Sequence, residues 1–172
     1  MMNETLKTIY TRRSTRKFIE KPIPEEEIAQ IVKAALCAPS GRGLQTWKFT
    51  VVENRQKIQK LAEAIGQVLG RSGYDMYQPE VLIIPSNQKN SPYGKEDDAC
   101  AMENIFLAAH SLGIGSVWIN QLQDICDDPR IRQILSEFEI PADHVVYGMA
   151  ALGYGEIPTD EKERTGKVAY IR

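Results

Sequence analysis

Residues 96–120 have the sequence EDDACAMENIFLAAHSLGIGSVWIN, and this stretch decides the fold class. Its first part is rich in alanine and free of proline and glycine, which predicts a helix from about Glu96 to Leu112. Gly113 follows at a position typical of a helix C-terminal cap. The apolar segment Gly115 to Asn120 then predicts a strand. A helix that leads directly into a strand indicates a domain that combines helices with a sheet.

Apolar spacing and turn residues outline the rest of the chain on either side of this stretch. Helices are predicted over residues 3–11, 24–37, 54–69 and 129–138. Strands are predicted over 47–53, 80–86 and 144–153, and loops over 12–22, 70–79, 87–95 and 154–172. The second helix is expected to bury Ile28, Ile31, Val32, Ala35 and Leu36. This mixture predicts an α+β or α/β architecture, with residues 1–172 as one domain.

The composition is that of an ordinary globular protein, with 172 residues, a net charge of -2, 42% hydrophobic and 26% charged residues. The longest basic run is Arg12-Arg13, which argues against a nucleic-acid binder. Cys37, Cys100 and Cys126 are widely spaced and odd in number, so we expect reduced thiols and no metal site. Residues 1–5 lack the features of a secretory signal, and no apolar run is long enough to span a membrane. We therefore expect a cytoplasmic protein without a membrane partner.

The sequence motifs of serine hydrolases, P-loop proteins and zinc peptidases do not occur in the chain. Gly153-Tyr154-Gly155 follows a predicted strand, but an isolated glycine pair is more typical of a turn than of a phosphate loop. Side chains therefore offer little nucleophilic or acid–base chemistry. Either the chain does not catalyse a reaction, or a bound cofactor performs the difficult step.

Two polar clusters are candidate binding sites. Arg12-Arg13-Ser14-Thr15-Arg16 combines three guanidinium groups with two hydroxyls, which suits a phosphate. A solvated basic face that offsets Glu20 and residues 25–27 explains it equally well. Residues 38–47, APSGRGLQTW, supply two glycines and several hydrogen-bonding groups between a helix and a strand, as either a ligand loop or a structural loop. The polar tail 154–172 is either a solvated terminus or an arm that docks on a partner or ligand.

Four blocks of sequence together resemble the nitroreductase family of FMN-dependent oxidoreductases, in its short members. The blocks are residues 12–18 (RRSTRKF), 38–49 (containing APSG and QTWKF), 104–119 (NIFLAAHSLGIGSVWI) and 152–155 (LGYG). They occur in the family's order over nearly the whole chain. The resemblance implies an α+β fold with a central, mainly antiparallel sheet flanked by helices, built as an intertwined homodimer. It also implies FMN in the subunit interface and NAD(P)H as electron donor, with the tail embracing the second subunit.

The resemblance also implies roles for individual residues. Arg12 and Ser14 match positions that hold the FMN phosphate and ribityl chain, with Lys162 and Arg164 as a phosphate clamp. Arg16 matches a cation near flavin N1 and O2, where it would stabilise the reduced ring; no side chain is implied as a catalytic acid or base. The full set implied for cofactor binding is Arg12, Arg13, Ser14, Arg16, Pro39, Ser40, Gly41, Gln45, Ile119, Asn120, Gln121, Lys162 and Arg164.

Within that set, the loop with Pro39, Ser40, Gly41 and Gln45 matches one that reaches FMN from the opposite subunit. The strand end Ile119, Asn120 and Gln121 matches backbone that faces flavin N5. The chain departs from the family pattern at Gly43, where Asn is common, and at Thr46, where Pro is common. Region 66–79 does not align with the longer members.

The resemblance predicts a two-step reaction in which NAD(P)H reduces FMN at N5 and a nitroaromatic, quinone or similar acceptor is reduced in turn. Tyr74, Tyr77 and Tyr93 are candidates for stacking on the acceptor, or are exposed turn residues. Alternatives on the same fold are reductive dehalogenation, flavin breakdown, or flavin binding without catalysis. A globular interaction domain without flavin is a further alternative.

Overall fold

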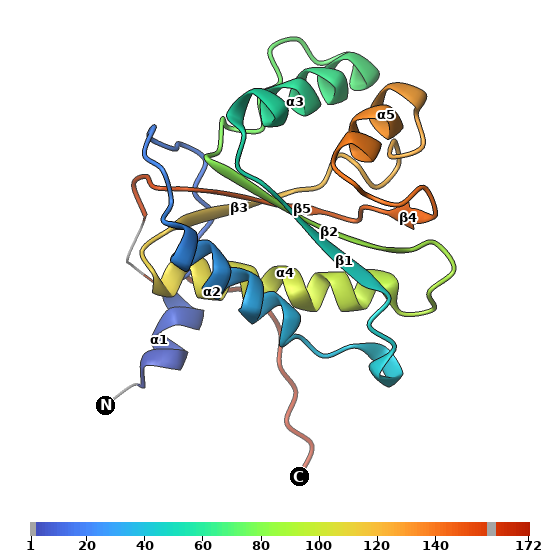
Figure 1. The fold of residues 1–172 in the computed structure, drawn as a ribbon. Helices are drawn as coiled ribbons and strands as arrows, with labels where there is room; N and C mark the ends of the chain where they lie inside the picture. The colour runs from blue at the N-terminus through green and yellow to red at the C-terminus, as the bar shows by residue number, and fades with distance from the viewer. Residues whose placement is uncertain (1–2, 158–160) are drawn as a thin grey trace.

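The computed structural model describes residues 3–157 and 161–172, which form a central sheet covered by helices on both faces (Figure 1). The strand order is β1 (Trp47–Val52), β2 (Val81–Gln88), β5 (Met149–Gly153) and β3 (Gly115–Ile119), and the short β4 (His144–Val145) pairs with the end of β2. Every named strand pair is antiparallel. This confirms the predicted α+β class and antiparallel sheet.

The described residues form five α-helices, and local sequence explains where two of them begin. The helices are α1 (Glu4–Thr11), α2 (Glu25–Leu36), α3 (Arg55–Leu69), α4 (Gly94–Ser111) and α5 (Pro129–Glu137), with a 3-10 turn at Gly41–Gly43. The side chains of Asn3 and Asn54 accept hydrogen bonds from the backbone N–H groups of Leu6 and Lys57. Such caps satisfy donors that the first helical turn leaves unpaired.

The helices divide into two layers, with α2 and α4 on one face of the sheet and α3 and α5 on the other (Figure 1). Each layer buries its own apolar cluster against the sheet. Ile31 and Ile105 are fully buried on the α2–α4 side, and Leu61 and Ile131 on the α3–α5 side. Because each such side chain contributes roughly 1.5–3 kcal/mol on burial, the two clusters fix the positions of α3 and α4 on the sheet.

Three predictions about the elements were wrong in part. The strand predicted over 144–153 is interrupted between β4 and β5, and its pairing with β2 shifts by one residue across the gap. The loop predicted over 87–95 is shorter, because β2 continues to Gln88 and α4 begins at Gly94. Leu36 is 53% exposed rather than buried, because it lies outside the buried face of α2, which continues past it to Ala38.

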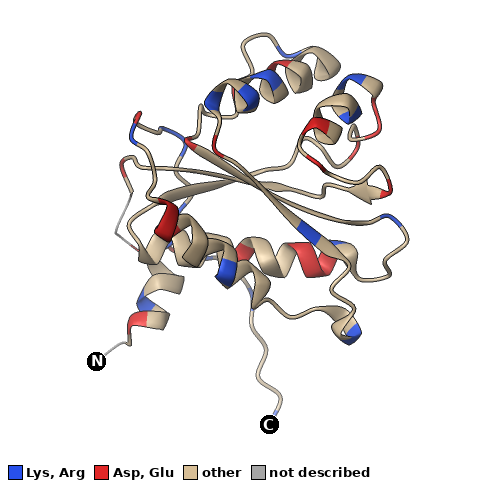
Figure 2. Ribbon diagram, in the orientation of Figure 1, with Lys and Arg blue, Asp and Glu red and all other residues tan. Residues whose placement is uncertain are grey.

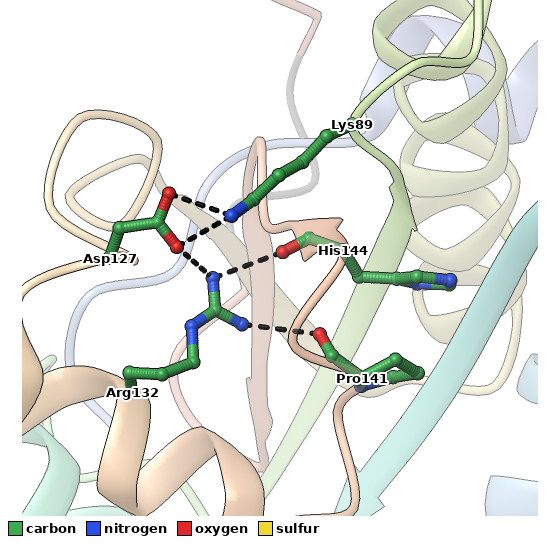
Figure 3. Close-up of polar contacts among 5 residues, drawn as sticks. All are labelled: Lys89, Asp127, Arg132, Pro141 and His144. Atoms are coloured by element: carbon green, nitrogen blue, oxygen red, sulfur yellow. Dashed lines mark hydrogen bonds and ion pairs between the residues drawn. The ribbon is translucent and has the colours of Figure 1, made fainter.

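A polar cluster ties α5 to the sheet (Figure 3). The Arg132 guanidinium donates to the backbone oxygens of Pro141 at 3.2 Å and His144 at 3.0 Å. It also contacts the Asp127 carboxylate, which accepts a hydrogen bond from Lys89 at 2.8 Å. The hydrogen bonds from Lys89 and Arg132 lower the pKa of Asp127. The cluster therefore joins α5, β4 and the segment after β2.

Charged residues lie mostly on the helices and loops, with both signs interspersed (Figure 2). Strands β2, β3 and β5 carry none, since each is buried between the two helical layers. Across residues 3–157 and 161–172, none of the helices has the length and apolar character that a membrane crossing requires. Two places depart from this even distribution of charge, the C-terminal end of α1 and the start of α4. The departure makes these two places informative.

Candidate functional site

Segment 12–18 runs beside strand β3, and this contact decides which of its side chains face outward. The backbone N–H of Thr15 donates to the carbonyl of Ser116 at 2.9 Å, and Ser14 forms a parallel bridge with the same residue. Thr15 is buried against Gly115, where a Cβ would be 2.8 Å from the threonine side chain. Because side chains alternate along extended backbone, Ser14 and Arg16 are exposed.

One face of α4 holds the end of α1. The guanidinium carbon of Arg12 lies 5.8 Å from the centre of the Phe106 ring, and its Nε is 3.6 Å from the Glu103 carboxylate. One turn further on, Nε2 of His110 is 2.8 Å from the hydroxyl of Thr11. Since that hydroxyl donates its hydrogen to the Lys7 carbonyl, the histidine is the donor. Burial and the nearby Arg12 lower the pKa of His110, which favours the neutral imidazole.

Three of the predicted phosphate residues meet at one cavity of about 420 Å³. Arg12 comes from the end of α1, and Lys162 and Arg164 come from the tail, which runs past this end of the domain. The other lining residues are Ile9, Tyr10, Glu103 and Glu161. Three cations around one cavity are an arrangement that binds a dianionic phosphate. Arg13 and Ser14 do not line this cavity.

The loop that contains Ser40 and Gly41 is fastened to the first turn of α4. The buried Asp97 carboxylate accepts from the Ser40 hydroxyl at 2.7 Å and from the Gly41 N–H at 2.8 Å. The Ser40 oxygen in turn accepts from the N–H of Gln45 at 2.9 Å. The Ser40 hydroxyl thus has both a hydrogen-bond acceptor, Asp97, and a donor, Gln45. Gln45 is exposed and has a positive φ of 48°. One carboxylate, which the sequence did not identify, thus holds two adjacent loop residues directly and Gln45 through Ser40.

The next residue along α4, Asp98, holds the start of β1 indirectly. Asn87 donates to Asp98 at 2.8 Å and accepts from the hydroxyl of Thr46 at 2.6 Å. Thr46 therefore has a structural partner at the position where the family often has proline. The second Asp98 oxygen is buried without a hydrogen-bond partner. Burial, opposed by the Asn87 hydrogen bond and reinforced by the neighbouring Asp97 charge, raises the pKa of Asp98 to about 7.

Gly41 is packed against an aromatic side chain. A Cβ at this position would be 2.3 Å from Cγ of Tyr93, which is closer than any real contact. We expect Gly41→Ala to lower the free energy of unfolding by about 1–3 kcal/mol, the usual cost of overpacking. Denaturant titration checks this when Gly41→Ala is introduced both into wild type and into the Tyr93→Ala variant. The alanine is expected to cost little once the ring is gone, and an equal loss in both backgrounds would contradict the steric explanation.

Side-chain hydrogen bonds hold the chain at the end of β3, just after Ile119. The amide oxygen of Gln121 accepts from the N–H of Asn120 at 3.1 Å and from the Tyr74 hydroxyl at 2.8 Å. Burial raises the pKa of Tyr74 to about 12, so the phenol keeps its proton for this bond. Ile119 is buried and Asn120 is exposed. Loop 70–79 therefore reaches the strand end predicted to face the cofactor.

The three candidate substrate tyrosines do not surround one cavity. Tyr74 lines a larger cavity of about 680 Å³ between the end of α3 and loop 70–79, which includes no predicted cofactor residue. Tyr77 is 41% exposed, and Tyr93 packs on Gly41. Pro39 is exposed beside the loop that Asp97 fastens. The predicted cofactor residues thus lie at the strand end after Ile119 and in two further parts, one at Arg12 and one at the Ser40–Gln45 loop.

These two parts are separated along α4. Asp97 is in its first turn, whereas Glu103 and Phe106 lie six and nine residues further on. At a rise of 1.5 Å per residue this is about 9–14 Å along the helix axis. Sequence reasoning missed Asp97 and Asp98, because acidic residues near a helix start are expected for the helix dipole alone. It also missed Glu103, because its contact with Arg12 joins residues that are distant in the sequence.

Comparison with known proteins agrees with this architecture. The nitroreductase family matches the chain over residues 9–79 and 70–154. A nitroreductase with bound FMN from Bacteroides fragilis is 40% identical with a TM-score of 0.88, covering 99% of this chain and 98% of its own. One with bound FMN from Desulfitobacterium hafniense is 26% identical with a TM-score of 0.86, covering all of both chains. A protein of Archaeoglobus fulgidus named as a candidate NADH dehydrogenase/NAD(P)H nitroreductase is 38% identical over 168 residues, which are 94% of this chain and 90% of that one. On the fold, the order of its motifs and these matches, the chain belongs to the nitroreductase family.

Proposed function

We propose that this protein binds FMN and uses NADH or NADPH to reduce electron-poor small molecules such as nitroaromatics and quinones. The observation that carries the proposal is the convergence of Arg12, Lys162 and Arg164 on one cavity. Their three positive charges suit the dianionic phosphate of FMN. The two solved nitroreductases with bound FMN, which share this fold, support the choice of cofactor.

The residues present fit FMN beyond its phosphate. Ser14 and Arg16 face outward on the segment that follows Arg12, so they would extend the site from the phosphate toward the ribityl chain and ring. Bound FMN supplies hydride chemistry at N5, which no side chain of the protein can replace. Arg16 would favour the negative charge that gathers at N1 and O2 on reduction. The strand end at Asn120 would face the other edge of the ring.

We infer that the protein is a homodimer of one-domain subunits. Helix α1 buries none of its side chains in the chain itself. Exposed apolar residues are concentrated on α1 and on the tail, at Leu6, Ile9, Tyr10, Val168, Tyr170 and Ile171. Apolar surface of this kind marks protein–protein contacts. The distance between the Arg12 cavity and the Ser40–Gln45 loop supports a site in which that loop serves the FMN of the other subunit.

Arg16→Ala is expected to lower the reduction potential of the bound flavin while leaving the melting temperature nearly unchanged. The side chain is exposed, so little packing is lost, but the fixed charge beside the reduced ring disappears. A redox titration of the FMN-loaded variant against wild type measures the shift. Lys17→Ala, one residue along, is the matched control, and equal potentials in Arg16→Ala and wild type would contradict the role of Arg16.

The three cysteines are free thiols, which supports a reducing compartment, and we propose the cytoplasm. The activity itself is tested by following NADH and NADPH oxidation by FMN-loaded protein with and without an acceptor. The proposal predicts that a nitroaromatic or a quinone accelerates oxidation of at least one nucleotide. Negligible oxidation with every acceptor, by protein that holds FMN, would contradict an enzymatic role and leave a flavin-binding protein.

A further inference from the structure

The cavity at Arg12 contains negative as well as positive charge. Arg12, Lys162 and Arg164 line it together with Glu103 and Glu161, so its charges sum to about +1. A dianionic phosphate placed there would leave a net negative charge. Carboxylates are unusual neighbours for a phosphate, because like charges repel and each weakens the attraction of the cations.

Glu103 is not required to hold Arg12 in place. Its oxygen is 3.6 Å from Nε of the guanidinium, which is longer than a hydrogen bond, and its side chain is 51% exposed. The arginine is fixed by other contacts: its backbone N–H donates to the Thr8 carbonyl at 3.0 Å, and its guanidinium lies over the Phe106 ring. An exposed ion pair of this kind contributes little to stability. The chief effect of Glu103 at this site is therefore its charge.

We propose that Glu103 limits the affinity of the phosphate site and so keeps FMN exchangeable. This rests on the proposed function, because it takes the cavity to be where the FMN phosphate binds. Removing the charge brings the lining to about +2, which matches a phosphate dianion. The proposal predicts that Glu103→Gln binds FMN about three- to ten-fold more tightly at low salt, since unit charges a few ångströms apart in water interact by about 1 kcal/mol.

Riboflavin separates a charge effect from a change of shape, because it has the same ring and ribityl chain but no phosphate. Dissociation constants for FMN and riboflavin are measured by flavin fluorescence quenching for wild type, Glu103→Gln and Glu96→Gln. Glu96 is an exposed residue of the same helix that does not line the cavity, so it is the matched control. Only Glu103→Gln should gain FMN affinity, its riboflavin affinity should not change, and the gain should shrink at high salt.

Two failures can be told apart. If wild type does not bind FMN, the proposed function fails. If wild type binds FMN and Glu103→Gln binds it equally or more weakly, the role of Glu103 is refuted and the function stands. A gain in affinity for riboflavin as large as the gain for FMN would also refute it, because the phosphate would then not be involved. Because the predicted change is a gain, loss of folding cannot imitate it.

Discussion

Arg12→Ala is expected to weaken FMN binding by about one to two orders of magnitude. A charge-assisted hydrogen bond to phosphate contributes roughly 1.5–3 kcal/mol, and each 1.4 kcal/mol changes the dissociation constant about tenfold. Arg12 has the best defined position of the three cations, because α4 holds it through Phe106. Titration of the apoprotein with FMN, followed by flavin fluorescence, measures the change.

Lys17→Ala is the matched control for this variant, because this exposed cation of the same segment does not line the cavity and is not among the residues implied to bind the cofactor. Its affinity for FMN should stay much closer to that of wild type. Riboflavin should bind wild type and Arg12→Ala with similar affinity, since it lacks the phosphate. An Arg12→Ala protein that melts normally and binds FMN as wild type does would remove Arg12 from the phosphate site.

Asp98→Asn is expected to stabilise the protein above neutral pH, by up to about 4 kcal/mol. The pKa of Asp98 is about 7 in the folded protein, against 3.8 as its ordinary value. Between these values the folded state keeps a proton that the unfolded state has lost. Wild-type stability attributable to this group therefore falls as pH rises from about 4 to 7. Asparagine resembles the protonated acid and has no charge to bury.

The measurement is the free energy of unfolding of wild type and Asp98→Asn by denaturant titration at several pH values from 4 to 8. The difference between the two should be small near pH 4 and should grow through the window up to about pH 7. A difference that does not vary with pH would show that Asp98 has no raised pKa. The groups that face Asp98 are Asn87, which stabilises its charge, Asp97, which opposes it, and Tyr147, whose own pKa the Asp98 charge helps to raise.

Local features of the fold could be predicted from the sequence, because short-range contacts determine them. The caps at Asn3 and Asn54 and the glycine after α4 depend on neighbouring residues only. Which side chains are buried was less predictable from the sequence. Helical periodicity identifies the apolar face of α2 but not how wide its buried part is, so Leu36 was wrongly expected to be buried. The break between β4 and β5 accompanies a change of register against β2, which is distant in sequence.

The candidate site was predictable only where the family resemblance supplied the residues. Arg12 and the tail residues Lys162 and Arg164 are about 150 positions apart, and no periodicity could have brought them to one cavity. Asp97 serves the Ser40 loop across more than 50 residues. Its position in the first turn of a helix already explained an acid there. Long-range polar contacts of this kind leave no mark on local sequence patterns.

A crystal structure of the protein grown with FMN tests the central claim most directly. It should show two subunits with a flavin between them, the phosphate in contact with Arg12, Lys162 and Arg164, and the Ser40–Gln45 loop approaching the flavin held by the other subunit. A lone chain without flavin, or a phosphate bound away from these three cations, would contradict the account.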